Sequence, residues 1–364
     1  MIVKEVTDLL EELAPLSYAE DFDNVGLLVG NMNTQVSGIL VALDTLENVI
    51  DEAIAHNCNI IVSFHPIIFK GLKKITGKTY VERVVMKAIR NDIAIYSMHT
   101  ALDNAKKGVN AKICEVLGIE NPEILIRQKK NVKKLTTYAP KSDADALKMA
   151  LFKAGAGNLG NYSHCSFVNE GTGSYLANED ANPTKGQIGK IHFEEETQIN
   201  VTYQKGAEAK ILNALFKNHP YEEVAYEVYA LENPYQHIGM GMIGNLKNAM
   251  EETAFLQHLK KTMHASCVRH SKLLGKPVKK IAVLGGSGAF AISAAKAAGA
   301  DVFVTADVKY HQFYEAEDDL VIADIGHYET EQFTKNLLVD YLTKKIPNFA
   351  VRLSESKTNP IKYL

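Results

Sequence analysis

The stretch LVIADIGHYETEQF, Leu320–Phe333, decides how this sequence is interpreted. An apolar run ends at Asp324, Gly326 follows, and a helical pattern then begins. His327 and Glu331 are four residues apart, so a helix places them on one face, one turn apart. An imidazole and a carboxylate at that spacing supply two ligands for one divalent metal ion. An isolated pair of this kind is more typical of a surface helix cap, so the metal hypothesis depends on the rest of the chain.

Composition bounds the class of protein. The chain has 364 residues, of which 46% are apolar and 23% charged, and its net charge of −3 gives no electrostatic reason to expect nucleic acid. No apolar run approaches the ~18 residues that a membrane helix requires, and no signal-peptide pattern opens the chain. The four cysteines are scattered without a CxxC motif, which favours neither disulfides nor a thiolate zinc site. We expect a cytoplasmic protein of two or three domains that binds neither nucleic acid nor a membrane.

Both ends of the chain alternate predicted strands with predicted helices. The strands are the apolar runs Gly38–Leu43, Asn59–Ser63, Ile93–Ser97, Lys280–Leu284, Val302–Thr305 and Leu320–Ala323. This βαβ alternation predicts parallel sheets, whose ligands bind at the carboxyl ends of the strands.

Between these parts the pattern changes. Residues 132–232 read as strand, helix, two strands, helix and strand, which is the order of a ferredoxin-like module. We therefore predict a discontinuous, mostly parallel α/β domain, 1–131 and 233–364, interrupted by an inserted ferredoxin-like α+β domain, 132–232. Within the insert, the motif HPYEE at 219–223 is more typical of a turn and strand entry than of a site.

Eight polar residues follow the predicted strands and collect at one end of them. They are Asp44, His65, His99, Asp103, Asp307, His311, His327 and Glu331. A single such residue usually has a structural or solvent-facing role, but eight at the same end favour a site. Nitrogen and oxygen donors without thiolate suit zinc, iron or manganese better than calcium or copper(I). Such a metal acts as a Lewis acid and lowers the pKa of bound water, which suits hydrolysis.

A second motif points elsewhere. The pattern Gly286-x-Gly288-x-x-Ala291 follows a strand and opens a helix, and Asp307 ends the next strand, as in a dinucleotide fingerprint. That interpretation leaves most of the strand-end histidines and carboxylates without a role. A third interpretation is a glycine-rich turn whose N–H groups bind an anion or nothing.

Several motifs, in the same order, resemble the NIF-three-like family over essentially the whole chain. They are DNVGLLVG (Asp23–Gly30), HPIIFKGLKKI from His65, HTALD (His99–Asp103), TAD with KYH at Lys309–His311, and GHYETE (Gly326–Glu331). The segments GAGNLGNYSHCSF and HPYEEVAYEVYAL resemble the PII-like or CutA-like insert of the longer bacterial members.

This resemblance implies a two-lobed α/β fold, a homohexameric ring and a two-metal site between the lobes. By motif, the metal ligands carry over to His65, Asp103, His327 and Glu331. His99 lies nearby as a candidate catalytic acid or base. The family usually has two histidines before the proline, whereas this chain has Phe64 as the first of them. We therefore expect one or two divalent ions per subunit (zinc, iron or manganese), with weaker occupancy of the second position.

Three functions follow from these interpretations. The first is a metal-dependent hydrolase of a nucleotide or related anionic molecule, since bacterial members are labelled GTP cyclohydrolase I type 2 homologues. Lysines in the segment 70–78 would attract such an anion. The second is a non-enzymatic metal-binding, regulatory or scaffold protein. The third is a nicotinamide-binding oxidoreductase based on the Gly286 loop.

Overall fold

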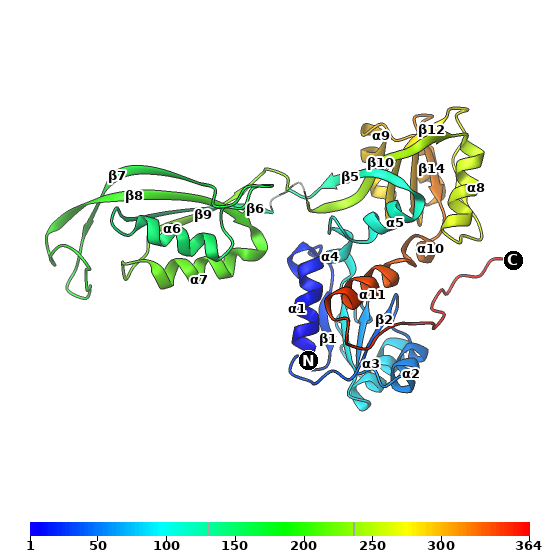
Figure 1. Cartoon of the computed structure of the whole chain (residues 1–364), viewed down its shortest axis with the longest axis horizontal. Helices are drawn as coiled ribbons and strands as arrows, with labels where there is room; N and C mark the ends of the chain where they lie inside the picture. Colours follow the sequence, from blue (N-terminus) through cyan, green and yellow to red (C-terminus); the bar gives the residue numbers. More distant parts are fainter. Residues whose placement is uncertain (130, 236) are drawn as a thin grey trace. The chain divides into compact units, whose positions relative to one another are not determined.

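The computed structural model describes residues 1–129, 131–235 and 237–364 (Figure 1). The chain divides into two compact units, one formed by residues 1–127 and 237–364 and the other by residues 128–236. Within the described ranges, no helix combines the length and the apolar character that crossing a membrane requires.

The first lobe of the larger unit is a five-stranded sheet with the order β1-β4-β3-β2-β15. Its strands are β1 (Gly26–Val29), β2 (Ile39–Ala42), β3 (Ile60–Ser63), β4 (Ala94–Ser97) and β15 (Val351–Leu353). All neighbouring pairs are parallel except β1 with β4. Its helices are α1 (Val3–Leu13), the 3-10 turn Leu16–Tyr18, α2 (Glu47–Ala55) and α3 (Tyr80–Arg90). The strands β2, β3 and β4 are buried along their whole length, as expected for parallel strands covered on both faces.

The second lobe is a six-stranded sheet with the order β11-β14-β13-β12-β10-β5. Its strands are β5 (Ile119–Arg127), β10 (Gly239–Met250), β11 (Arg269–His270), β12 (Val278–Ser287), β13 (Val302–Ala306) and β14 (Val321–Asp324). The central strands β12, β13 and β14 run parallel, and the outer strands pair antiparallel with them or with each other. The remaining helices of the unit are α4 (His99–Asp103), α5 (Val109–Leu117), α8 (Glu252–Thr262), α9 (Ile292–Ala297), α10 (His327–Glu331) and α11 (Thr334–Lys345), with 3-10 turns Ala289–Ala291 and Tyr310–Ala316.

One hydrophobic core joins the two lobes. It includes Val41 of β2, Val283 of β12, and Leu338 and Leu342 of α11, all fully buried. Truncating a leucine in such a core to alanine typically costs about 2–5 kcal/mol of stability. This shared core fixes the lobes against each other, so side chains from both can form one site.

The parallel strands of both lobes direct their carboxyl ends toward the same region. Asp44, His65 and His99 follow β2, β3 and β4, and Asp307 and His327 follow β13 and β14. The predicted two-lobed α/β fold with mostly parallel sheets is therefore confirmed. The helical pattern that begins after Gly326 forms two helices, α10 and α11.

The smaller unit has its own sheet and its own core. Its elements are β6 (Val132–Pro140), α6 (Ala144–Lys153), β7 (Ser166–Leu176), β8 (Ile191–Gln204), the 3-10 turn Lys205–Ala207, α7 (Glu208–Asn218) and β9 (Tyr226–Leu231). The strands pair antiparallel in the order β7-β8-β6-β9. Leu135, Ile199, Leu151 and Leu215 are buried between the sheet and its two helices. Assignment of this unit to the ferredoxin-like class stays a prediction.

Candidate metal centre

His65 is oriented by the end of the neighbouring strand. Its main-chain N–H donates to the carbonyl oxygen of Leu43 at 2.9 Å, which continues the β2–β3 pairing. Its Nδ1 lies 2.7 Å from Oδ1 of Asp44. Because a carboxylate only accepts hydrogen bonds, Nδ1 carries the hydrogen of this contact. The other ring nitrogen, Nε2, is thereby the one available to a metal ion.

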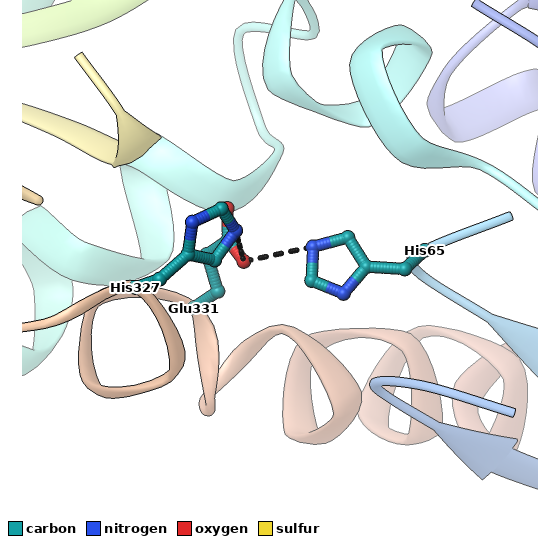
Figure 2. Close-up of side chains that lie close together, drawn as sticks. All are labelled: His65, His327 and Glu331. Carbon is teal, nitrogen blue, oxygen red and sulfur yellow. Dashed lines mark ion pairs between the residues drawn. The ribbon is translucent and has the colours of Figure 1, made fainter. Parts of the chain in front are cut away.

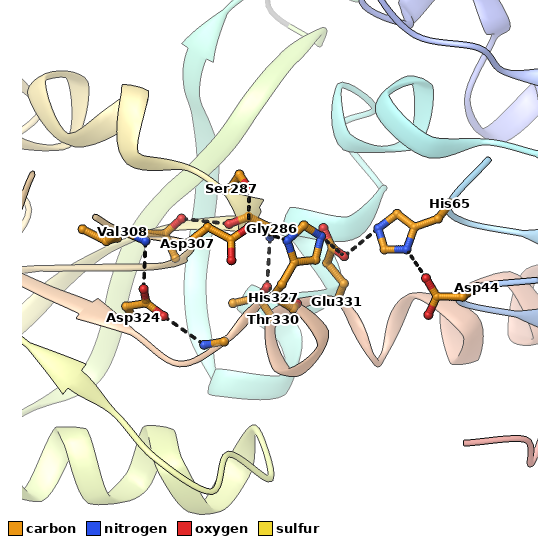
Figure 3. Close-up of polar contacts among 12 residues, drawn as sticks. Asp44, His65, Gly286, Ser287, Asp307, Val308, Asp324, His327, Thr330 and Glu331 are labelled. Carbon is orange, nitrogen blue, oxygen red and sulfur yellow. Dashed lines mark hydrogen bonds and ion pairs between the residues drawn. The ribbon is translucent and has the colours of Figure 1, made fainter. Parts of the chain in front are cut away.

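His327 is oriented in the same way in the second lobe. Its Nδ1 lies 2.7 Å from Oδ2 of Asp307, which also accepts a hydrogen bond from the hydroxyl of Ser287. Asp307 has a left-handed backbone with φ of 56°, a conformation that non-glycine residues adopt rarely and at a cost of about 1 kcal/mol or more. Asp307 thus keeps a strained backbone at the position where its side chain fixes the imidazole of His327 (Figure 3).

Glu331 lies between the two imidazoles (Figure 2). Its Oε2 is 3.0 Å from Nε2 of His65 and 3.1 Å from Nε2 of His327. Glu331 is buried, and these two imidazole contacts compensate the charge of its carboxylate. The three ligand atoms lie within 4.8 Å of one another. Two imidazole nitrogens and one carboxylate oxygen therefore converge on one point, as ligands of a shared cation do.

Charge within this cluster is balanced by close contact. Burial would lower the pKa of His65, but Asp44 and Glu331 raise it to about 10. Burial likewise opposes protonation of His327, whose pKa Glu331 and Asp307 raise to about 9. Burial would raise the pKa of Glu331, but the two adjacent imidazoles lower it to about 2. Without metal, protons on the imidazoles supply the positive charge that the buried carboxylates require.

The glycine-rich end of β12 makes room for Glu331. A β-carbon on Gly286 would lie 2.4 Å from Oε1 of Glu331, and Gly286 has a left-handed φ of 69°. The Gly286 N–H donates to the hydroxyl of Thr330 at 2.9 Å, and the Gly286 carbonyl accepts from the hydroxyl of Thr305. The space at Gly286 and its two main-chain hydrogen-bonding groups are used inside the site, which gives this glycine a structural role that does not require a dinucleotide.

Asp103 is the fourth predicted ligand and ends α4. Its Oδ1 is buried and has no hydrogen-bond partner within the described part of the chain. Burial, and next the charge of Glu331, raise the pKa of Asp103 well above its usual range, and the charges of His65 and His327 also act on it. Asp103 is not one of the three residues whose ligand atoms converge, so its role as a ligand stays a prediction.

His99 forms a third aspartate–histidine pair. Its Nδ1 lies 2.8 Å from Oδ1 of Asp23, whose other oxygen accepts from the N–H and hydroxyl of Thr100. Burial would raise the pKa of Asp23, but His99 and Thr100 lower it to about 2. The ring of His99 is centred 5.5 Å from that of His65. Sequence reasoning did not assign Asp23 a role, although it opens the motif DNVGLLVG.

Phe64 lies at the edge of the cluster and is fully buried. Its ring is centred 4.9 Å from that of His65 and 5.6 Å from that of His99. It therefore packs in the core and also borders the two imidazoles, with no lone pair to offer a metal. Of the other strand-end residues, His311 lies exposed against Tyr310 and Tyr314, outside the cluster.

The donor set fits a divalent transition metal. Imidazole nitrogens and a carboxylate oxygen are the ligands that zinc, iron and manganese share. Each imidazole has a carboxylate partner on its other nitrogen, the outer-shell arrangement that orients metal-bound histidines. Oδ1 of Asp103, which is buried and has no hydrogen-bond partner within the described part of the chain, is a further group that a cation in this place would satisfy. The aspartates that hold the imidazoles, Asp44 and Asp307, were recognised as strand-end residues, but not as their partners.

Known proteins resemble this chain along essentially its whole length. The sequence profile of the family described as Duf34/NIF3 (NGG1p interacting factor 3) matches residues 1–360. A Bacillus subtilis protein described as "GTP cyclohydrolase 1 type 2 homolog" is 38% identical over 367 aligned positions, which cover 99% of this chain and 98% of the relative. A relative from Halalkalibacterium halodurans with the same description is also 38% identical, with the same coverage.

A solved structure shows the same architecture. The Bacillus cereus protein related to NIF3 superposes with a TM-score of 0.82 at 37% sequence identity, covering 100% of this chain and 99% of that one.

Proposed function

Because this chain belongs to the Duf34/NIF3 family, we propose that it binds a divalent transition metal through His65, His327 and Glu331. We propose further that it uses this metal to hydrolyse a nucleotide or a related anionic molecule. The metal-binding part rests on the geometry of the cluster. The hydrolytic part rests on the donor chemistry and on the groups that surround the cluster.

One observation carries the metal-binding part. Oε2 of Glu331 is buried and lies within 3.1 Å of both Nε2 atoms, so three potential ligand atoms share one point at which positive charge is required. Without a metal ion, a proton on each imidazole supplies this charge. A divalent cation held by the three atoms would supply it in place of those protons.

The chemistry of hydrolysis divides between metal and chain. When bound, a divalent ion withdraws electron density from an oxygen and lowers the pKa of water, so that hydrolysis proceeds at neutral pH. The protein's own contribution is to hold and move a proton. His99 is suited to this because Asp23 fixes its Nδ1 at 2.8 Å and leaves Nε2 to exchange a proton with substrate or water. Phe64 excludes water from the side of the two imidazoles that it contacts.

The anionic substrate is supported by the loop that follows His65. Lys70, Lys73, Lys74 and Lys78 are exposed there, between β3 and α3. Exposed lysines close to a metal site raise the local concentration of a phosphorylated ligand. The description that the relatives carry makes GTP the first substrate to test.

The first experiment measures bound metal. We expect purified protein to contain zinc, iron or manganese by elemental analysis, and His327→Ala and Glu331→Gln to lose most of it while keeping the wild-type circular dichroism spectrum. His270→Ala is the matched control, since His270 is exposed on β11 and outside the cluster. Wild-type metal content in both site variants would overturn the metal-binding part.

The second experiment measures turnover. Metal-loaded wild type and Glu331→Gln are assayed against GTP and a panel of nucleotides with each of the three metals. Turnover that disappears in Glu331→Gln and falls in His99→Ala supports the hydrolase. Tight metal binding without turnover of any member of the panel would overturn it and leave a non-enzymatic metal-binding protein.

Assembly is a further part of the proposal. We propose a homo-oligomer, a hexamer by family resemblance, and analytical ultracentrifugation of the full chain tests it. A monomer at micromolar concentration contradicts this part alone.

A further inference from the structure

The motif HPYEE, 219–223, lies between α7 and β9 in the smaller unit and is more than a connection. His219 is buried, its Nε2 lies 2.9 Å from the carbonyl oxygen of Tyr138, and its Nδ1 accepts the N–H of Tyr221 at 3.1 Å. Both ring nitrogens are thus used, with the hydrogen on Nε2. Burial lowers the pKa of His219, which agrees with a neutral ring. His219 therefore fixes the position of Tyr221 against β6.

Tyr221 in turn holds a carboxylate of β8. Its hydroxyl donates to Oε1 of Glu196 at 2.9 Å. On the neighbouring strand β7, a β-carbon at Gly173 would lie 2.1 Å from Oε2 of Glu196. Glycine at this position leaves the space that the carboxylate occupies. The ring of Tyr175 is centred 6.1 Å from that of Tyr221, so two aromatic rings stand beside the same carboxylate.

The loop between β7 and β8 encloses the space beside these residues. The hydroxyl of Tyr175 donates to the carbonyl oxygen of Lys185 at 2.7 Å. The hydroxyl of Thr184 donates to the carbonyl oxygen of Pro220 at 2.9 Å. The N–H of Asn182 donates to Oε1 of Glu222 at 2.8 Å. These contacts tie the loop to the HPYEE segment and border a cavity of about 380 Å³.

Charge in this cavity is one-sided. Its lining contains the carboxylates of Glu196, Glu222 and Glu223 and no lysine, arginine or histidine. Glu194, two residues before Glu196 on β8, forms an ion pair with Lys185 at 2.5 Å, and its other oxygen lies 3.0 Å from Nε2 of His192. Within the described residues, no such ion pair neutralises the three cavity carboxylates. Burial and the carboxylates of Glu194 and Glu196 raise the pKa of Tyr175, as a negative local potential does.

We propose that this cavity, lined by Tyr175, Tyr221 and Glu196, is a binding site for a small organic cation that carries an alkylammonium or guanidinium group. Aromatic faces attract organic cations, and a carboxylate held by a tyrosine hydroxyl gives the head group a charged acceptor. A bare metal ion would fill only a small part of about 380 Å³. The lining carboxylates repel anions, so the ligand of this cavity differs in charge from the substrate proposed for the metal centre.

The test titrates full-length protein with agmatine, butylamine and choline by calorimetry, with butyrate as the anionic counterpart. We expect saturable binding of at least one cation and none of butyrate. Glu196→Gln should weaken that binding roughly tenfold, since one charge-assisted contact is worth about 1.4 kcal/mol or more. Gly173→Ala should also weaken it by displacing the Glu196 carboxylate. Glu195→Gln is the matched control, because Glu195 points to the opposite face of β8 and is exposed.

Three results overturn the proposal: no saturable binding of any of the cations, equal losses in Glu196→Gln and Glu195→Gln, or tighter binding of butyrate. Zinc or magnesium binding that depends on Glu196 and excludes the organic cations also overturns it. Thermal unfolding of each variant separates loss of binding from loss of fold. The metal-site variant His327→Ala should bind the cations as wild type does, so this proposal stands or falls independently of the metal centre.

Discussion

The hydroxyl of Thr358 donates a 2.7 Å hydrogen bond to Oδ2 of Asp44, whose other oxygen holds Nδ1 of His65. The segment after β15 therefore reaches the candidate metal centre through two hydrogen bonds in series. Nearby in the same segment, the hydroxyl of Ser354 donates to Glu52 at 2.6 Å, which fixes the segment on α2. The end of the chain thus contributes to the orientation of a residue close to 300 positions earlier in the sequence.

Replacing Thr358 should weaken metal binding without unfolding the protein. Thr358→Val keeps the shape of the side chain but frees Asp44 to rotate, so His65 loses part of its orientation. We expect metal affinity to fall roughly 2–10-fold, less than the 10–100-fold typical of direct partners of a ligand. Competition with a chelator measures it. Thr358→Ser retains the hydroxyl and should bind as wild type; equal affinity in all three proteins would show that Thr358 does not position the site.

Adding a methyl group at Gly286 should disturb Glu331. The β-carbon would lie 2.4 Å from Oε1, and a left-handed φ of 69° adds backbone strain of about 1–3 kcal/mol. Gly286→Ala should therefore lower both stability and metal content. Gly299→Ala is the matched control, because Gly299 has φ of 71° and a β-carbon added there would have no heavy atom within 4 Å apart from those of the adjoining residues. It should lose stability but keep its metal, whereas similar metal loss in both variants would refute a specific role of Gly286.

Metal binding should release protons at neutral pH. The pKa of His65 is about 10 and that of His327 about 9, so both rings are protonated at pH 7 without metal. A metal ion on the two Nε2 atoms displaces about two protons, and apparent affinity rises with pH until these groups have titrated. Calorimetry in buffers of different ionisation enthalpy counts the protons. Because folding raises both pKa values, the two protonated imidazoles stabilise the metal-free protein. This contribution to the free energy of unfolding is complete below pH ~6.5 and disappears as pH rises through 9–10. Proton release near zero at pH 7 would contradict this.

The smaller unit should be removable. Arg127 at the end of β5 is the register partner of Gly239 at the start of β10, so the two ends of the larger unit already meet as an antiparallel pair. Replacing residues 128–236 by a short Gly/Ser linker should give a folded protein that binds metal with unchanged affinity. An insoluble or metal-free product would show that the larger unit depends on the insert.

Phe64→His tests the missing imidazole. The ring at this position is fully buried and centred 4.9 Å from that of His65, so an imidazole there would add a nitrogen donor beside the cluster. We expect a higher ratio of metal to protein at saturating metal than in wild type, measured by elemental analysis after gel filtration. Phe64→Leu, which offers no donor, is the control. If wild type already binds two ions per chain as tightly, the phenyl ring does not limit the second position.

Local sequence pattern predicted much of the fold. Apolar runs such as Ile60–Ser63 are strands because a parallel sheet covered on both faces leaves only buried positions for their side chains. Alternation of such runs with helical patterns predicted parallel connections, and polar residues directly after them marked the strand ends. The four-residue spacing of His327 and Glu331 likewise followed from helical geometry alone.

Partnerships across the chain were decided only by the tertiary structure. The pairs Asp44–His65 and Asp307–His327 join strand ends 20 or 21 positions apart, whereas Asp23–His99 spans 76 positions. A spacing along one helix restricts distance because its residues share one rigid element. Residues on different elements have no such restriction until the core shared by the lobes sets the elements against each other. The sequence by itself therefore determined which residue types stand at the strand ends. Packing of the two lobes decided that His65 meets Glu331, because the two residues belong to different lobes.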